Sequence, residues 1–487
     1  MSTEALASAS LRSYGPQSLP GRAALEGVFG LLLVALMLLS TVDEALASPA
    51  RALFLGCFAV LTVINVGAAA AVYIAAVLVF SVHHSGGNLS YVQRPDNVAF
   101  LFLTGYLLAG RCFSRSAGRF GRTGAAVALL LLTTATHLAA LVGIEWFWFA
   151  WFARMFAIPL VMFVLLRRAA LSPREVRAML LIIGALGIYL AAVSLLEVVG
   201  WYGLIVPPWI ADPSFNPIFG FARVGGVAMQ AEWNALQISL GLCVVLLMFA
   251  QGKNGIRVGW IAGAGLCLLA IYFCYTRAAY LGLLVGGVPL FWQRSAAAGT
   301  SVRRRVLFLI GVIGFASFVL FFPSEILQSR VSDTGNVYFR LNIWAAGMGM
   351  LAAHPLFGVG FGHFSRHMLP YLRDLEVIPT MGAYAEGNLA HNTLLSVAGE
   401  LGLVGLSLYC LVVWGVFNVA RTSAGTAWGP MGRLWVAGFT LVYLVNIQFV
   451  TAHVLGPNAI YFGVLGAIAG MRCREGPPRG VPALSRP

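Results

Sequence analysis

Charged residues are scarce in this chain of 487 residues. Asp, Glu, Lys and Arg make up only 10% of it, against 60% hydrophobic residues, and the mean hydropathy is +0.86. Soluble globular domains carry about 25% charged residues, so the composition excludes an ordinary soluble fold. The sequence therefore belongs in a lipid bilayer.

Acidic residues are rarer still, with 17 Asp and Glu against 31 Lys and Arg and a net charge of +14. The basic residues are spread over many segments, and no polar stretch is long enough to form a soluble basic domain. Nucleic-acid binding is therefore not supported. The charge instead reports membrane topology and an attraction to anionic membrane lipids.

Cysteine is also sparse, and its positions exclude a disulfide framework because they fall in apolar segments or on the predicted cytoplasmic side. The seven positions are Cys57, Cys112, Cys243, Cys267, Cys274, Cys410 and Cys473.

Long apolar runs dominate what is present. A run of about twenty apolar residues spans the hydrocarbon core of a bilayer. We place such runs near 25–42, 51–66, 69–83, 97–112, 123–142, 147–166, 177–199, 233–250, 257–275, 278–293, 305–322, 393–420, 434–451 and 456–472. The second and third could form one re-entrant element, because residues 66–71 offer almost no polar turn. The sequence thus predicts an all-α polytopic integral membrane protein of about 12–14 transmembrane helices.

The arginines predict its orientation. With a cytoplasmic N-terminus, most of the 31 basic residues lie in cytoplasmic loops, and the first apolar run reads as an uncleaved helix. Both termini are then cytoplasmic. Arg154 lies inside a predicted span and must face protein or water. The opposite side holds Arg51, Arg94, Arg223, Arg277, Arg330, Arg340, Arg366 and Arg373.

The predicted organisation follows from this topology. We expect cytoplasmic tails at 1–24 and 473–487, transmembrane helices with short loops over 25–322, and C-terminal transmembrane helices over 393–472. Between them, residues 323–392 form a large periplasmic loop before the twelfth span. At roughly 70 residues, a loop of this length is generally functional or disordered.

The sequence of this loop predicts a folded cap with a short amphipathic helix. Arg340, Trp344 and Met348 recur every four residues and so share a face. Pro355 then ends the helix, and the glycines at 358, 360 and 362 favour a tight turn rather than a dinucleotide site, because no strand precedes them.

No metal site is predicted. Asp374, Glu376 and Glu386 form an acidic cluster on the outer side, for which solvation is favoured over cation binding. His83 and His84 are adjacent but lack a third ligand at metal-site spacing.

Candidate chemistry gathers in the stretch LAHNTLLSVAGELGLVG, residues 389–405. His391 could be an interfacial residue at a helix start, followed by Asn392 or Thr393 as an ordinary N-cap. Glu400 lies nine residues further on, about 900 degrees of helix rotation, which puts it on the opposite face. Arg277 could equally snorkel to the membrane surface.

Four motifs in order resemble the O-antigen ligase and O-antigen polymerase superfamily. They are ARVGG, YTRAAYLG, FRLNIWAAGMGMLAAHPLFGVGFGHF and AHNTLLSVAGELGLVGL, within residues 219–412. ARVGG lacks the Asn-Pro pair that often follows it in the family, which makes Arg223 the weakest match.

The resemblance implies a metal-independent glycosyltransferase without a cofactor, in the bacterial cytoplasmic (inner) membrane with its active site facing the periplasm. It would move a glycan from undecaprenyl pyrophosphate to a lipid or glycan acceptor in lipopolysaccharide or exopolysaccharide biosynthesis, alongside other polysaccharide-assembly proteins. His391 would act on the acceptor, while Arg277, Arg340 and Arg223 would bind the donor pyrophosphate. These side chains should converge in one cavity that admits a polyprenyl chain.

Several alternatives stay open. A ligase, a polymerase and a protein O-glycosylating enzyme share these motifs and differ in the acceptor. A lipid-linked oligosaccharide flippase or a non-catalytic assembly protein also fits many apolar helices with several arginines. A transporter would place its polar groups near the midplane, with repeated halves, and the sequence shows neither.

Overall fold

The computed structural model describes residues 20–41, 44–80, 94–112, 122–141, 146–212, 223–251, 254–291, 335–372, 390–450 and 454–471. Helices and turns make up this described part, in which no strand occurs. The predicted all-α class is therefore confirmed for it. The tails at 1–19 and 472–487 and the span expected near 305–322 lie outside the described residues.

The first half of the chain is a run of apolar helices. In order they are α2 (Pro20–Leu39), α3 (Glu44–Ile64), α4 (Val66–Phe80), α5 (Pro95–Tyr106) with the π-helix η2 (Leu107–Cys112), α6 (Arg122–Leu141), α7 (Trp146–Phe152), η3 (Ala153–Ala157), α8 (Ile158–Arg168) and α9 (Pro173–Val199). Three short 3-10 turns follow, η4 (Tyr202–Leu204), η5 (Pro208–Ala211) and η6 (Gly226–Ala228).

The second half supplies the helices that carry the candidate residues. They are α10 (Ala231–Gln251), α11 (Asn254–Phe273), α12 (Arg277–Phe291), α15 (Gly335–Ala353), α16 (Phe364–His367), the turn η7 (Leu369–Tyr371), α18 (Thr393–Asn446) and α19 (Leu455–Ala469). The helix expected in the long loop is thus present as α15.

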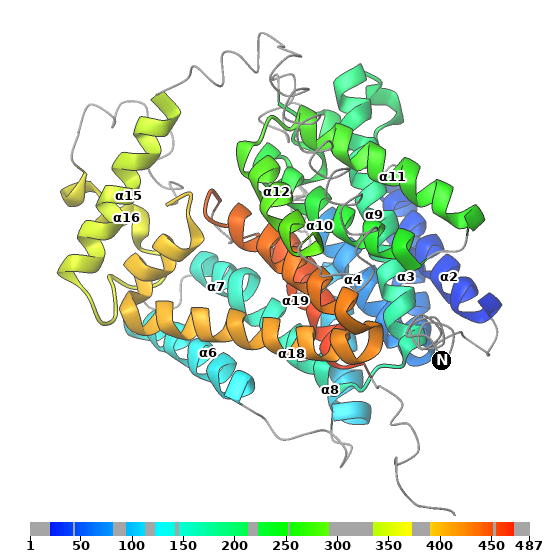
Figure 1. The fold of residues 1–487 in the computed structure, drawn as a ribbon, viewed down its shortest axis with the longest axis horizontal. Coiled ribbons are helices and arrows are strands. Elements are labelled where there is room, and N and C mark those ends of the chain that lie inside the picture. Colours follow the sequence, from blue (N-terminus) through cyan, green and yellow to red (C-terminus); the bar gives the residue numbers. More distant parts are fainter. Residues whose placement is uncertain are drawn as a thin grey trace, which may run out of the picture.

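Two helices form the centre of the molecule. Almost every residue of α4 and of α19 is buried, because both are apolar on all sides, as expected of a helix surrounded by protein. In Figure 1, α19 crosses the middle of the bundle, with α2, α3, α9 and α11 on one side and α15 with α16 on the other. α19 packs against α8, α18 and α4, and α18 also packs against α6, α12 and α15.

Within the described part of the chain, four helices are long and apolar enough to cross a membrane: Phe149–Arg168, Pro173–Val199, Ala231–Gln251 and Thr393–Asn446. Shorter apolar helices are Leu25–Leu39, Ser48–Ile64, Val66–Val79, Arg257–Phe273 and Leu455–Ala469. The chain is therefore a multi-pass membrane protein. The number of spans and the sides of the membrane stay predictions.

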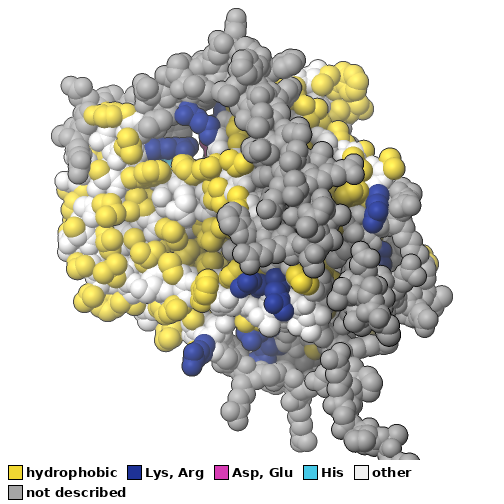
Figure 2. Space-filling view, viewed as in Figure 1, with side chains coloured by type: hydrophobic (Ala, Val, Ile, Leu, Met, Phe, Trp, Pro, Cys, Tyr) yellow, Lys and Arg dark blue, Asp and Glu magenta, His cyan; other side chains and the backbone are white. Residues whose placement is uncertain are grey.

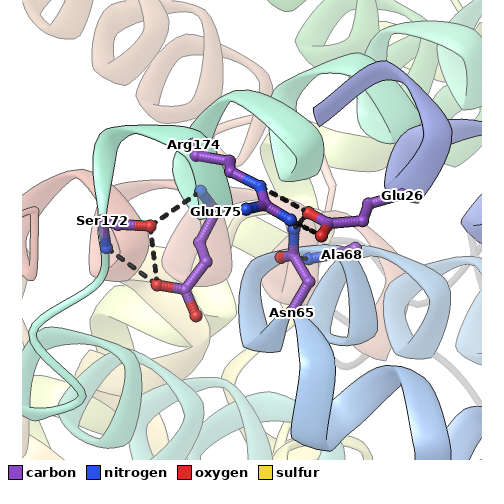
Figure 3. Close-up of polar contacts among 6 residues, drawn as sticks. All are labelled: Glu26, Asn65, Ala68, Ser172, Arg174 and Glu175. Carbon is purple, nitrogen blue, oxygen red and sulfur yellow. Dashed lines mark hydrogen bonds and ion pairs between the residues drawn. The ribbon is translucent and has the colours of Figure 1, made fainter. Parts of the chain in front are cut away.

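The structure divides the expected second and third spans at Asn65, which caps α4. Its side-chain oxygen accepts a hydrogen bond from the Ala68 amide at 2.8 Å, and its amide donates to Glu26 of α2 at 2.7 Å. Glu26 also pairs with Arg174 in the first turn of α9 (Figure 3). This cluster, Glu26, Asn65 and Arg174, ties three helices together at one place.

A capping box starts α9 beside that cluster. The Ser172 hydroxyl accepts from the Glu175 amide at 3.3 Å, and the Glu175 carboxylate accepts from the Ser172 amide at 2.8 Å (Figure 3). Such reciprocal bonds satisfy donors that a helix start otherwise leaves unpaired. They fix where α9 begins relative to α2 and α4.

The spans expected at 393–420 and 434–451 meet in one long element, α18, which two glycines interrupt. Gly402 has φ 66° and ψ −166°, and Gly429 has φ 66° and ψ −156°. Both conformations favour glycine, because a side chain there is strained. The sequence did not predict the first break, at Gly402, beside which the Leu403 and Val404 amides bond to the Pro355 and Leu356 carbonyls.

Candidate functional site

Charged side chains from separate parts of the chain meet at one end of the bundle. Arg223 precedes α10, Glu232 lies in the first turn of α10, Arg277 begins α12, and Arg340 lies on α15. Glu232 joins them: its Oε1 is 2.8 Å from Nη1 of Arg223 and 3.9 Å from Nη2 of Arg340. In Figure 2, basic side chains are visible in a hollow on the face shown.

Arg223 is held on several sides. Besides Glu232, its Nε donates to the Cys274 carbonyl at 3.3 Å and its Nη2 donates to the Thr276 hydroxyl at 3.2 Å. The guanidinium therefore ties the start of α10 to the turn that precedes Arg277. This placement favours a positioning role over direct donor contact for Arg223.

Arg340 is the more available of the two arginines beside Glu232. Its side chain is 29% exposed, against 19% for Arg223. Partial burial lowers the pKa of Arg340, the Glu232 charge raises it, and the charges of Arg223 and Arg277 lower it. Arg277, itself exposed, therefore lies within electrostatic reach of Arg340.

His391 belongs to the same group of charges. Burial lowers the pKa of His391 below its ordinary value of 6.5, Arg340 lowers it further, and Glu232 opposes the shift. The imidazole is therefore neutral near pH 7 and able to accept a proton. His391 thus lies within electrostatic reach of Arg340, as Arg340 does of Arg277.

The backbone around His391 is firmly held. Trp344 of α15 donates from its indole nitrogen to the Ala390 carbonyl at 3.0 Å. Asn392 caps α18 by accepting from the Leu395 amide at 3.0 Å. The Thr393 amide donates to the Ile447 carbonyl at 2.8 Å, so the far end of α18 also anchors its start.

Three helix starts face this cluster. α10 begins just before Glu232, α12 begins at Arg277, and α18 begins just after His391. A residue with positive φ precedes each of them: Met229 at 55°, Tyr275 at 47° and His391 at 46°. Helix N-termini carry partial positive charge, which adds to the attraction of the arginines for an anion.

A strap of residues 354–364 fastens α15 to α18. Its Val359 and Gly360 amides donate to the carbonyls of Gly399 and Glu400 at 3.0 and 2.9 Å. In return, the amides of Leu403 and Val404, freed by the break at Gly402, donate to the Pro355 and Leu356 carbonyls at 2.8 and 3.2 Å. The expected glycine turn is therefore present, as the docking strap of the helix that carries Arg340.

Glu400 supports this strap and not His391, as the sequence spacing indicated. The carboxylate is buried and accepts from the Phe364 amide at 3.2 Å. An apolar cluster also joins the strap to α15. In it, Phe364 and Met368 pack against the buried α15 residues Ile343, Ala346 and Met350.

Glu232 is the site residue that sequence reasoning missed. It lies at the boundary between a predicted outer loop and a predicted span, in the first turn of α10. Its acidic charge at a helix start was a signal, but one that ordinary helix capping also explains.

The remaining predicted positions stand apart or are not described. Arg154, in η3, lies within electrostatic reach of Asp96 at the start of α5. His83, His84, Asp374, Glu376 and Glu386 lie outside the described residues. Within the described ranges, no three His, Cys, Asp or Glu residues are grouped to hold a metal ion, and the cysteines found there are free.

A small apolar pocket of about 10 Å³ lies between α10, the end of α18 and the start of α19. A pocket of this size has room for about one water molecule. It is too small for a polyprenyl chain, so the predicted lipid cavity stays a prediction. Its lining residues are Trp233, Leu236, Ile447, Val450, Val454, Pro457 and Asn458.

Comparison with known proteins connects this geometry to a family. Residues 262–410 match the O-antigen ligase family, within the region 219–412 where we expected the resemblance. Arg277, Arg340 and His391 lie inside the match, while Arg223 and Glu232 lie outside it. The chain is also 24% identical over 265 residues to the exopolysaccharide production protein ExoQ of Rhizobium meliloti (strain 1021).

That alignment covers 51% of this chain and 59% of the Rhizobium protein, so the chain spans less than two thirds of this relative. The resemblance to the O-antigen ligase and polymerase superfamily is confirmed by both matches. The chain is thus related to proteins of cell-surface polysaccharide biosynthesis.

Proposed function

We propose that this multi-pass membrane protein, which carries an O-antigen ligase segment, transfers a glycan from undecaprenyl pyrophosphate to an acceptor hydroxyl on the periplasmic side of the inner membrane. One observation carries the proposal. The charge of Arg340 acts on His391, which lies 51 positions further along the chain, and the charge of Arg277 acts on Arg340, while Glu232 lies 3.9 Å from Arg340.

The pyrophosphate is the natural ligand of such a cluster. Guanidinium groups bind phosphate oxygens through charge-assisted hydrogen bonds. In the transfer, Arg277 and Arg340 would stabilise the charge that develops on the leaving pyrophosphate. That leaving group is already good, so it needs cationic stabilisation more than a proton.

The acceptor hydroxyl needs a base, and His391 is the neutral group beside the cluster. The hydroxyl oxygen forms a bond to the anomeric carbon of the glycan while the bond from that carbon to the pyrophosphate oxygen breaks. The bonding pair leaves with undecaprenyl pyrophosphate. The acceptor proton passes to His391, whose depressed pKa keeps it unprotonated beforehand.

Purified protein in detergent or nanodiscs tests the proposal. The His391→Ala variant should bind a lipid-linked donor as the unmodified protein does and should transfer no glycan, because the base is lost while the arginines remain. A well-folded His391→Ala variant with full transfer activity would refute the mechanism. A flippase or a non-catalytic assembly protein would then be the favoured interpretation.

The acceptor is a separate question, which glycan analysis of a deletion strain answers. Full-length polymer accumulating on the carrier lipid would identify a ligase. Single repeat units accumulating there would identify a polymerase.

A further inference from the structure

The strap leaves two neighbouring apolar side chains exposed. Leu356 is 59% exposed and Phe357 is 57% exposed, whereas Phe361 and Phe364, further along the strap, are buried. Single exposed apolar residues are normal, but a pair that continues a larger apolar surface marks an interaction site. The surroundings of this pair therefore decide what covers it.

The face of α18 that lipid contacts begins beside the pair. Over residues 393–402 no side chain of α18 is exposed, whereas after the break at Gly402 exposed side chains recur along one face of the helix. Because α18 is long and apolar enough to cross a membrane, that face is the one that meets the acyl chains. Its exposed residues are Leu403, Ser407, Cys410, Leu411 and Trp414.

Arg421 marks the opposite end of this face. It is exposed and lies 18 residues after Leu403, which is five turns of helix, so both side chains point to the same side. At 1.5 Å per residue they are about 27 Å apart along the axis, and the hydrocarbon core of a bilayer is about 30 Å thick. With Arg421 reaching the headgroups on one side, Leu403 lies at the other boundary of the hydrocarbon.

The strap is attached to α18 at this boundary. The Pro355 and Leu356 carbonyls accept hydrogen bonds from the Leu403 and Val404 amides at 2.8 and 3.2 Å. Leu356 therefore lies beside the first residue of the lipid-facing face.

Helix α6 gives a second measure of this height, because it packs along α18 (Figure 1). Thr123 of α6 lies against Gly415 of α18, and the ring of Phe357 lies 6.3 Å from that of His137. The rise along α6 from Thr123 to His137 is about 21 Å, and along α18 from Gly415 back to Leu403 it is about 18 Å. The two routes agree to within one turn, so Phe357 lies at the same boundary.

The backbone of the exposed pair is paired as contact with lipid requires. The His354 carbonyl accepts from the Gly358 amide at 3.0 Å, and the next two carbonyls accept from α18. Pro355 has no amide hydrogen to satisfy. An unpaired backbone group is strongly unfavourable in hydrocarbon, whereas in water it costs little. Three consecutive paired carbonyls thus suit a loop that meets acyl chains.

We propose that Leu356 and Phe357 form a membrane anchor, whose side chains insert among the acyl chains of the lipid leaflet that surrounds Leu403. Burial of two large apolar side chains in lipid stabilises the strap at the boundary. Since the strap directly follows α15, the membrane boundary passes the end of the helix that carries Arg340. This anchor goes beyond the proposed glycan transfer and does not depend on it.

Spin labels on single cysteines test the anchor in vesicles of phosphatidylethanolamine and phosphatidylglycerol. In a background without native cysteines, Leu356→Cys and Phe357→Cys are compared with Leu411→Cys on the lipid-facing side of α18 and with Leu369→Cys in η7. The last two side chains are 55% and 47% exposed, so exposure alone does not separate the four positions. Molecular oxygen concentrates in acyl chains, and a neutral nickel chelate stays in water. Oxygen collisions should predominate at 356, 357 and 411, and nickel collisions at 369.

Two results would overturn the anchor. Nickel collisions at Leu356→Cys and Phe357→Cys as frequent as at Leu369→Cys would place the pair in water. Protection of both positions from oxygen and from nickel would show that protein covers them, either a partner or a second copy of the chain.

A second measurement fixes the depth of the anchor with a different label. Leu411 lies about 12 Å deeper than Leu403 along α18. Bimane at Leu356→Cys or Phe357→Cys should therefore be quenched more by lipids with a nitroxide near the headgroup than by lipids with a nitroxide deep in the acyl chain. Bimane at Leu411→Cys should show the reverse. Stronger quenching of the strap labels by the deep nitroxide would contradict their place at the boundary.

Discussion

At the scale of single residues, the candidate site combines one neutral histidine with arginines that differ in exposure and in their hydrogen bonds. His391 is kept unprotonated by burial and by Arg340. Arg223 donates hydrogen bonds to Cys274 and Thr276, in the turn before Arg277. The residues most suited to contact substrate are therefore Arg277, Arg340 and His391.

The pH dependence of transfer follows from His391. Its pKa is lowered, so the group stays neutral, and the enzyme active, to lower pH than an ordinary histidine would allow. Activity should be constant through pH 7 and fall only below the usual histidine pKa of 6.5. Arg340→Gln removes one cause of the depression, so its residual activity should begin to fall at higher pH. A midpoint above 6.5 in the unmodified protein would contradict this assignment.

Arginine geometry gives a second test. Replacing Arg277 or Arg340 by Lys keeps the charge and loses the planar fork that binds phosphate in two places. Transfer should fall about tenfold to a hundredfold, roughly 1.4–2.8 kcal/mol of transition-state stabilisation. Arg366→Lys, on the exposed surface of α16, is the matched control and should retain normal activity. Equal losses in all three variants would count against a specific site.

The sequence predicts Arg277, Arg340 and His391 as site residues, because each stands in a motif of recognisable type and order. It did not identify Glu232, since an acidic residue at a helix start has an ordinary capping explanation. Nor did it show that Arg223 is tied to Cys274 and Thr276. Contacts between residues some 50 positions apart depend on the packed bundle and leave no local pattern.

At the scale of elements, the joint between the strap 354–364 and α18 fastens the helix that carries Arg340 to the helix that begins after His391. The helix break at Gly402 leaves the amides of Leu403 and Val404 free to donate hydrogen bonds to carbonyls of the strap. At the other end of the strap, the Glu400 carboxylate accepts a hydrogen bond from the Phe364 amide. The sequence indicated the glycine turn, because Pro355 and three spaced glycines are strong local signals. It did not indicate the break, because one glycine within an apolar run is common in membrane helices.

Substitution at Gly402 should loosen this joint. A Cβ at that position would clash with the backbone at Leu356 and Phe357, and φ 66° strains any residue with a side chain. We expect Gly402→Ala to lower stability by about 1–3 kcal/mol, measured by thermal unfolding in detergent, and to reduce transfer. Gly265→Ala is the control, since a Cβ there meets nothing within 4 Å. An active and equally stable Gly402→Ala variant would show that the joint is not required.

At the scale of the whole molecule, the arrangement predicts that the site faces the periplasm. Leu369, 47% exposed in η7, lies in the predicted outer loop, and Met431, 37% exposed, lies between the predicted inner arginines Arg421 and Arg433. In a background without native cysteines, Leu369→Cys should react with a membrane-impermeant maleimide added outside spheroplasts. Met431→Cys should react only after permeabilisation. The reverse pattern would overturn the topology and the proposed mechanism together.

We also expect transfer to be independent of metal ions. In the proposed site, arginines would supply the positive charge that a metal ion would otherwise bring to the pyrophosphate. Transfer by purified protein should therefore continue in chelator at its normal rate. Loss of activity that magnesium or manganese restores would contradict this and would direct attention to Asp374, Glu376 and Glu386.

The anchoring of Thr393 has a consequence for how the protein is made. Its amide and hydroxyl bond to the carbonyls of Ile447 and Val450, at 2.8 Å each, beyond the far end of α18. A ribosome adding about 5–20 residues per second needs roughly 10–30 s to travel from Arg277 to Val450. During that interval the nascent chain lacks the carbonyls that hold the start of α18 beside His391. We therefore expect the proposed site to be complete only after the last helices have inserted.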